Sequence, residues 1–255
     1  MLKMRLLIVP FALLTLVSCT KDKGDTTPPK FVSVTVQGES ENPIYLNAGT
    51  SIAVMAELSD DEALKQVKID LHDDFDGHDH NKAGFTPWTY VNIISVNGKS
   101  AVAVDTTTIP EEATAGVYHA VLRVLDKAGN EGEFVEKVLI IKNGSEPIIS
   151  VSAPNFNTTP QFAAGDVISM AGSISDVDEF EEIHILLRQQ EDVDHYITFG
   201  EREFDLADQN VSSFDLSAVS LTIPTDAKAG EYEVAIIAVD KLGNQGIYYG
   251  HLRVE

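Results

Sequence analysis

The stretch that decides the fold reads Ala115-Gly116-Val117-Tyr118-His119-Ala120-Val121-Leu122-Arg123-Val124. Beginning at Tyr118, every second residue is an apolar one suited to a core, and the residues between them include His119 and Arg123. Successive side chains of an extended strand point to opposite faces, so a period of two indicates a half-buried β-strand. Residues 67–72 alternate in the same way, with Val67, Ile69 and Leu71 facing one side. The chain is therefore expected to consist of strands, not helices.

This stretch belongs to a unit that occurs twice. Three blocks return at one spacing: residues 108–110, 115–118 and 126–132 correspond to residues 222–224, 229–232 and 240–246. A repeat of this length predicts two tandem modules, covering residues 29–143 and 144–255 and joined at Asn143-Gly144-Ser145-Glu146.

Short alternating runs separated by Gly, Asn and Asp turns recur along both modules. They lie at residues 31–36, 51–58, 101–108 and 133–141 in the first copy, and at 148–152, 166–174, 183–188, 211–222, 231–239 and 247–254 in the second. With the two runs above, this amounts to about seven strands per copy, which is typical of an immunoglobulin-like (Ig-like) sandwich. The predicted fold class is all-β, with two tandem Ig-like antiparallel β-sandwich domains after a lipoprotein signal peptide.

Two local features support the Ig-like prediction. Tyr118 and Tyr232 each open the penultimate strand, where such sandwiches place a tyrosine whose hydroxyl bonds back to the preceding loop. An ordinary half-buried strand tyrosine is the alternative. Asp126 and Asp240 precede Gly-Asn pairs, and we expect their carboxylates to brace the last hairpin through backbone N–H groups.

The N-terminus predicts export. Lys3 and Arg5 precede an apolar run at residues 6–16, which is too short for a membrane span. The run Leu16-Val17-Ser18-Cys19 resembles the lipobox of bacterial lipoproteins, which implies a signal peptide at residues 1–18 and acylation of Cys19. A buried or redox-active thiol is the alternative for this lone cysteine.

Residues 19–28 are polar and end in prolines, as expected of a flexible tether. Thr20 follows the cysteine where aspartate would resemble an inner-membrane retention signal, so the expected location is the outer membrane, on its periplasmic face or at the cell surface. Lys21-Asp22 faintly resembles a surface-export signal.

The charge is strongly negative. The chain has 18 Lys and Arg against 40 Asp and Glu, a net charge of −22. This argues against a nucleic-acid partner, because phosphate backbones would be repelled. It favours cations, although acidity that only keeps the protein soluble is an equal alternative.

One stretch concentrates metal-binding side chains: His72-Asp73-Asp74-Phe75-Asp76-Gly77-His78-Asp79-His80. In an extended chain, residues two apart point the same way with Cα atoms roughly 7 Å apart, so His78 and His80 can chelate one ion. A turn at Asp76-Gly77 would bring His72 to them, and His119 on the neighbouring strand is a further ligand or an orienting group. The predicted ligands are His72, His78, His80, Asp74, Asp76 and His119, a set suited to Zn²⁺, Cu²⁺ or Ni²⁺.

Two alternatives to this site stay open. His72, Asp74, Asp76 and Gly77 have the rhythm of a calcium-binding EF-hand loop, but that loop would need glutamate where Ala83 stands, so calcium is the less suitable ion. The second alternative is that the segment is a solvated acidic loop whose histidines bind no metal. In the second copy Arg188 replaces His72 and a loop at residues 189–195 follows. We therefore interpret His184, His195 and His251 as surface residues and expect no tight site there.

The lipobox, the His72–His80 stretch and the Ile-Pro, Ala-Gly-x-Tyr and Asp-x-x-Gly-Asn blocks together resemble the "domain of unknown function 4625" family of Gram-negative Ig-like lipoproteins. The resemblance implies an Ig-like fold and export and assigns no activity. The function expected is an anchored lipoprotein that binds a divalent transition metal, for capture or for delivery to an outer-membrane transporter. The alternative is an adhesive, glycan-binding or structural module, in which Trp88 and Tyr90 stack on a sugar. No motif predicts an enzyme.

Overall fold

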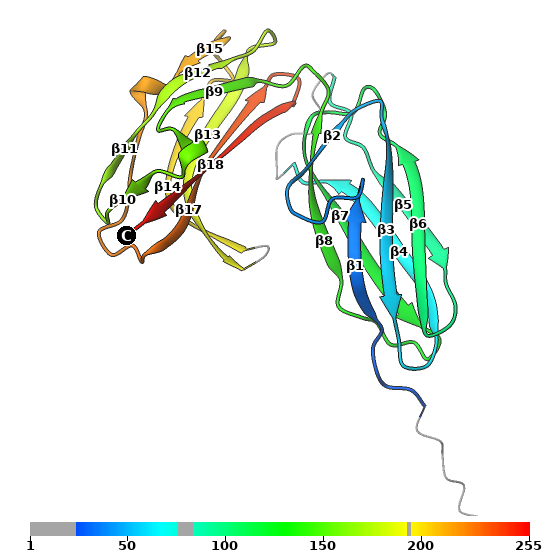
Figure 1. The fold of residues 1–255 in the computed structure, drawn as a ribbon. Coiled ribbons are helices and arrows are strands. Elements are labelled where there is room, and N and C mark those ends of the chain that lie inside the picture. Colours follow the sequence, from blue (N-terminus) through cyan, green and yellow to red (C-terminus); the bar gives the residue numbers. More distant parts are fainter. Residues whose placement is uncertain (1–23, 76–83, 193–194) are drawn as a thin grey trace, which may run out of the picture.

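Two layers of mainly antiparallel strands enclose each of two separate cores (Figure 1), and the pairs β2–β8 and β10–β18 are parallel. The computed structural model describes residues 24–75, 84–192 and 195–255. The predicted signal peptide, Cys19, Asp76, His78 and His80 lie outside these ranges and stay predictions. In the described part of the chain, no helix is long and apolar enough to cross a membrane.

The first sandwich packs a three-stranded sheet, ordered β1-β3-β6, on a five-stranded sheet, ordered β2-β8-β7-β4-β5. Its strands are β1 (Lys30–Val36), β2 (Ile44–Asn47), β3 (Ser51–Ser59), β4 (Leu64–Asp73), β5 (Tyr90–Ser95), β6 (Ser100–Thr108), β7 (Gly116–Asp126) and β8 (Val135–Lys142). The alternating apolar side chains of β3, β4 and β7 point inward and form the core.

The second sandwich repeats this plan with a five-stranded sheet, ordered β10-β18-β17-β13-β14, against the sheet β15-β12-β9 and the pair β11-β16. Its elements are β9 (Ile148–Ala153), β10 (Gln161–Phe162), β11 (Val167–Ser169), β12 (Ala171–Ser175), β13 (Phe180–Asp192), β14 (His195–Asp205), β15 (Ser213–Asp215), β16 (Ser220–Thr222), β17 (Gly230–Asp240) and β18 (Gln245–Val254), with short 3₁₀ turns η1 (Phe156–Thr158) and η2 (Leu216–Ala218).

The all-β prediction is confirmed, with local differences. The sequence patterns missed β2, β5, β10 and β14, and the single strands expected at 166–174 and 211–222 are each divided in two. β5 was missed because its large apolar residues Val91 and Ile93 face solvent, which hides the period. The loop predicted at residues 189–195 is wrong, since β13 continues to Asp192 and pairs with β14.

Both corner tyrosines are confirmed. The Tyr118 hydroxyl donates to the Thr114 carbonyl oxygen at 2.8 Å, and the Tyr232 hydroxyl donates to that of Lys228 at 3.0 Å. The aspartate braces are also as expected: Asp126 Oδ1 accepts from the backbone N–H of Asn130 at 2.7 Å, and Asp240 Oδ1 accepts from that of Asn244 at 2.8 Å.

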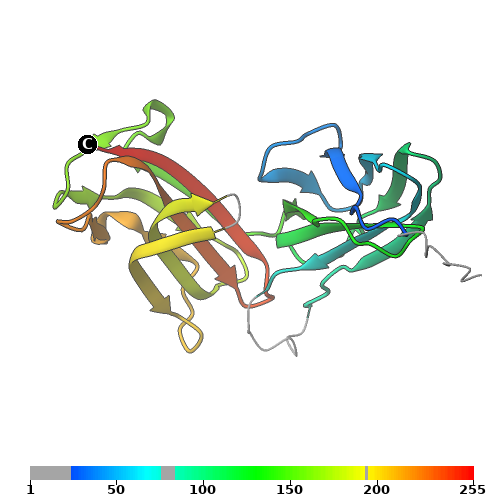
Figure 2. The same ribbon diagram turned by 90° about the horizontal axis from the view of Figure 1, so that it is seen from below.

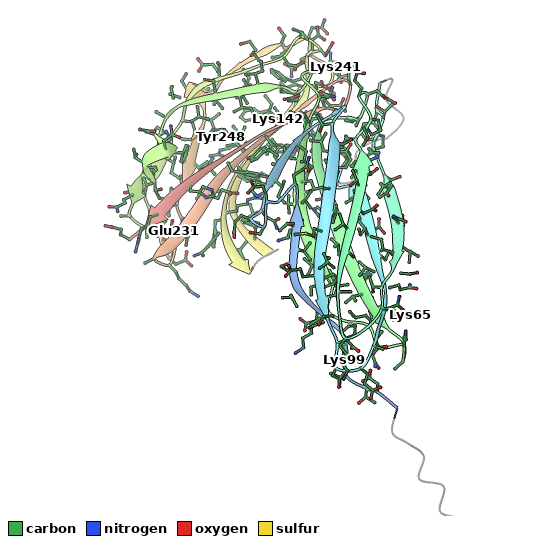
Figure 3. The ribbon with its side chains drawn as sticks, turned by 45° about the vertical axis from the view of Figure 1, so that its right-hand side comes forward. Lys65, Lys99, Lys142, Glu231, Lys241 and Tyr248 are labelled. Atoms are coloured by element: carbon green, nitrogen blue, oxygen red, sulfur yellow. The ribbon has the colours of Figure 1, made fainter. Side chains whose placement is uncertain are left out.

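The two sandwiches meet at one end of each (Figures 1 and 2). Asn244 Oδ1 accepts from the backbone N–H of Ala115 at 3.1 Å and from Asn143 Nδ2 at 2.7 Å. The Gln245 backbone N–H donates to the Ala115 carbonyl oxygen at 2.9 Å. Figure 3 shows Lys65 and Lys99 at the far end of the first sandwich, where the N-terminal segment leaves it. Since β4 begins beside Lys65, it carries His72 toward the junction.

Candidate metal site

Strand pairing places His72 and His119 side by side. β4 and β7 are antiparallel neighbours, and His72 stands directly opposite His119. Their ring centroids are 6.1 Å apart. Both side chains lie on the outer face of the sheet, because the residues next to them in each strand, Leu71 and Tyr118, point into the core. The expected neighbourhood of these two histidines is therefore confirmed.

Carboxylates surround this pair. Asp74 Oδ2 lies 3.3 Å from His119 Nε2, and Glu136 Oε1 on β8 lies 2.9 Å from His119 Nδ1. Asp70 Oδ1 lies 3.2 Å from His72 Nδ1. The hydrogen bond from His119 lowers the pKa of Asp74 despite its partial burial. Each imidazole thus has its Nδ1 engaged by a carboxylate, and in His119 the Nε2 faces Asp74.

The ends of the histidine-rich segment are held close to this pair. Phe75 is buried and packs edge-on against Tyr118, with ring centroids 5.4 Å apart. Phe85, on the far side of residues 76–83, packs edge-on against Phe75 at 5.3 Å. The Asp74 backbone N–H donates to the Val117 carbonyl oxygen at 3.0 Å. Phe75 and Phe85, on either side of the predicted ligands Asp76, His78 and His80, therefore lie near Tyr118, the neighbour of His119 in β7.

The described ligands alone do not form a complete centre. Within the described ranges, groups of three side chains whose ligand atoms all lie within 4.8 Å of one another occur elsewhere, and none includes His72, Asp74 or His119. Two of those groups contain only aspartates, and the third is Glu182, His184 and Glu203.

A cleft of about 770 Å³ separates the outer faces of the two large sheets. Asp74, His119 and Glu136 line it from the first sandwich, and His184 and Arg188 are among the residues that line it from the second. In the repeat, the cross-strand pair His72 and His119 is replaced by Arg188 opposite Glu233. These two form an ion pair at 2.6 Å, and the Arg188 guanidinium lies 4.0 Å from the Tyr196 ring centroid. The second copy therefore has a salt bridge where the first has two imidazoles.

His184 does not fit the sequence interpretation. It was expected on the surface, but its side chain is only 21% exposed, with Glu201 Oε1 3.1 Å from Nδ1 and Glu182 Oε2 3.3 Å from Nε2. His251 is exposed as expected, at 67%. The sequence patterns did not predict β14, and it is the pairing of β13 with β14 that places Glu201 and Glu203 beside His184.

His184 should remain protonated well above neutral pH in the chelator-treated protein. The interaction with Glu182 raises the pKa of His184 to about 9. Burial acts in the opposite direction, and the interaction with Glu201 adds to the increase. Because the folded pKa exceeds the unfolded value of about 6.5, this contribution to stability is complete below about pH 6.5 and is lost as pH rises through 9. Imidazole NMR should show a midpoint near 9 that falls in Glu182→Gln. A midpoint near 6.5 in the parent protein would contradict the geometry.

The suggested sugar platform is not formed. Trp88 is only 7% exposed, and its ring stacks on Tyr90 with centroids 6.5 Å apart and packs near Tyr118. The Tyr90 hydroxyl donates to Asp105 Oδ2 at 3.0 Å. Trp88 is therefore a core residue, and its buried faces are occupied by the protein itself.

Two overlapping segments, residues 17–141 and 136–255, match a family model described as "Domain of unknown function (DUF4625)". No curated protein matches the chain. Solved structures resemble its fold at low identity. Clostridium thermocellum CbhA fibronectin(III)-like modules are 14% identical over 87% of this chain and 92% of theirs, with a TM-score of 0.26. A chimeric titin Z1Z2 tandem is 14% identical over 89% of this chain and 100% of its own, with a TM-score of 0.31.

Proposed function

Because the chain belongs to the DUF4625 family through both of its halves, and because its first sandwich pairs two imidazoles among carboxylates, we propose that it is an anchored lipoprotein that binds a divalent transition metal. The ligands from the strands are His72 and His119, with Asp74 between the strand and the segment that follows. Asp76, His78 and His80 supply the remaining ligands in this proposal. Zn²⁺, Cu²⁺ or Ni²⁺ suits imidazole and carboxylate donors, and calcium suits them less.

The observation that carries the proposal is the cross-strand position of His72 opposite His119. Metal-bound histidines ordinarily donate their second ring N–H to a carboxylate, which fixes the tautomer and the ring orientation. Asp70 and Glu136 are placed to do this at the Nδ1 atoms of His72 and His119. Two ligands bound to one tetrahedral zinc at about 2.0–2.1 Å stand roughly 3.3 Å apart, which is the distance between His119 Nε2 and Asp74 Oδ2.

The position of the pair suits capture from outside the membrane. Lipid attached at Cys19 would hold the end of the first sandwich where Lys65 and Lys99 lie (Figure 3). Because β4 begins beside Lys65 and ends at Asp73, the His72–His119 pair lies toward the other end. A metal ion bound there stands away from the bilayer and would then be passed to an outer-membrane transporter. This delivery step is part of the proposal.

Isothermal titration of the mature chain, with Cys19→Ser replacing the lipidated residue, tests the proposal. We expect a transition-metal site that weakens as pH falls through the histidine range, because protons compete for the imidazoles. His72→Ala with His119→Ala should weaken it about 100-fold or more, in line with loss of two ligands. His251→Ala, an exposed histidine of the second sandwich, is the matched control.

The loop ligands have a separate test. If His78→Ala with His80→Ala leaves the titration curve unchanged, the segment does not contribute and the site is confined to the strands. If neither pair of substitutions changes the curve, the first sandwich is not the metal site.

A further inference from the structure

A second cluster of ligand side chains is built on the hairpin of the second sandwich. His184 on β13 stands directly opposite Glu203 on β14, and Glu182 lies two residues before His184 on the same face of its strand. The three side chains each offer a ligand atom, and these atoms all lie within 4.8 Å of one another. Since paired strands fix all three backbones, the cluster needs no loop to assemble it.

The two ring nitrogens of His184 have different surroundings. Nδ1 lies 3.1 Å from Glu201 Oε1 and is hydrogen-bonded to it. Nε2 is shielded from solvent and, among the residues that the structure describes, has no hydrogen-bond partner. It faces Glu182 Oε2 at 3.3 Å, roughly the separation of two ligands on one tetrahedral zinc. A divalent ion can take the place between Nε2 and Glu182 Oε2 that a proton fills in the ion pair.

We propose that Glu182, His184 and Glu203 form a second divalent-metal site, independent of the one in the first sandwich, with Glu201 orienting the imidazole through Nδ1. One imidazole and two carboxylates suit Zn²⁺ and leave a coordination position open. Two carboxylate charges balance a divalent ion, whereas a single proton on His184 leaves the cluster negative. The site lies on the wall of the cleft, so water or a carboxylate of a bound molecule can complete it.

The equivalent strand of the first sandwich does not carry these ligands. In the first copy, β4 carries Gln66 and Lys68 at the positions of Glu182 and His184. Lys68 Nζ is bonded there to Asp70 Oδ2 at 2.6 Å. The first sandwich therefore lacks this cluster, just as the second lacks the paired imidazoles. Each module would hold its own ion in a different place on equivalent sheets.

The test uses the mature chain with His72, His78, His80 and His119 all changed to Ala, so that the first site is removed. Titration with ZnCl₂ should show one remaining site. Adding His184→Ala should abolish it, and adding Glu203→Gln should weaken it at least tenfold while leaving the far-ultraviolet circular dichroism unchanged. His251→Ala, which removes another histidine lining the cleft, should have no effect.

The outcomes separate the two proposals. If the fourfold variant binds no zinc, or binds it equally well with Glu203→Gln and His184→Ala, the second site is refuted and the first is unaffected. If the parent chain loses all binding through His184→Ala alone, the first-sandwich proposal fails and the second site stands.

Discussion

Alanine in place of Gly246 is expected to lower the free energy of unfolding of the second sandwich by about 3 kcal/mol, the upper part of the range for overpacking a filled site. Gly246 is on β18, and a Cβ atom there would lie 2.1 Å from the Pro147 carbonyl oxygen and 2.9 Å from the Pro147 Cβ. Pro147 immediately precedes β9, so its backbone cannot move away without shifting a strand of the opposite sheet. Urea unfolding measures the change.

Gly200 on β14 is the matched control, because a Cβ there meets nothing within 4 Å. Gly200→Ala should be neutral or slightly stabilising, since alanine restricts the unfolded chain more than glycine does. Equal effects at the two positions would show that strand propensity, not the contact with Pro147, decides the result. The first sandwich has an equivalent site, where a Cβ atom on Gly132 would lie 2.2 Å from the Pro29 carbonyl oxygen.

Asn244→Ala is expected to separate the two sandwiches. Asn244 is buried; its Oδ1 accepts from Ala115 and Asn143 of the first sandwich, and its Nδ2 donates to Asp240 Oδ2 at 2.8 Å. Removing the Asn244 amide leaves its buried hydrogen-bond partners unsatisfied, and each unsatisfied group costs about 1–3 kcal/mol. Small-angle X-ray scattering should therefore show a larger radius of gyration, and exchange of the Ala115 amide should become faster.

Asn130 provides the control for this second prediction. It occupies the same place in the repeat and donates to Asp126 Oδ2 at 2.6 Å, but its Nδ2 also donates to the Asp25 carbonyl oxygen, at the N-terminal end of the same sandwich. Asn130→Ala should destabilise the first sandwich and leave the scattering curve unchanged. A compact Asn244→Ala protein would mean that the contacts of Gln245 are enough to hold the junction.

The two metal proposals rest on the same arrangement of side chains. In His72, His119 and His184 the Nδ1 atom faces a carboxylate, supplied by Asp70, Glu136 and Glu201 respectively. This arrangement fixes a tautomer whose Nε2 can bind a metal. His119 and His184 line opposite walls of the cleft, so the way the sandwiches dock sets how closely two bound ions approach.

The sequence by itself determined the features that depend on local order. Alternation along Val67–Leu71 and Tyr118–Val124 identified strands, because a strand's two faces repeat every second residue. The spacing of the repeated blocks identified the tandem arrangement, and Tyr118 and Asp126 were placed correctly because corner and turn geometry involves residues close in the chain.

Only the tertiary structure decided which distant side chains meet. His72 faces His119, and His184 faces Glu203, through registers that no single strand encodes. Glu203 was overlooked because β14 mixes charged and apolar residues without the alternation that marked other strands, and Trp88 looked available although the core encloses it. Strand pairing is a property of two segments and of the core they share, so the candidate ligands became a geometry only once both sheets had formed.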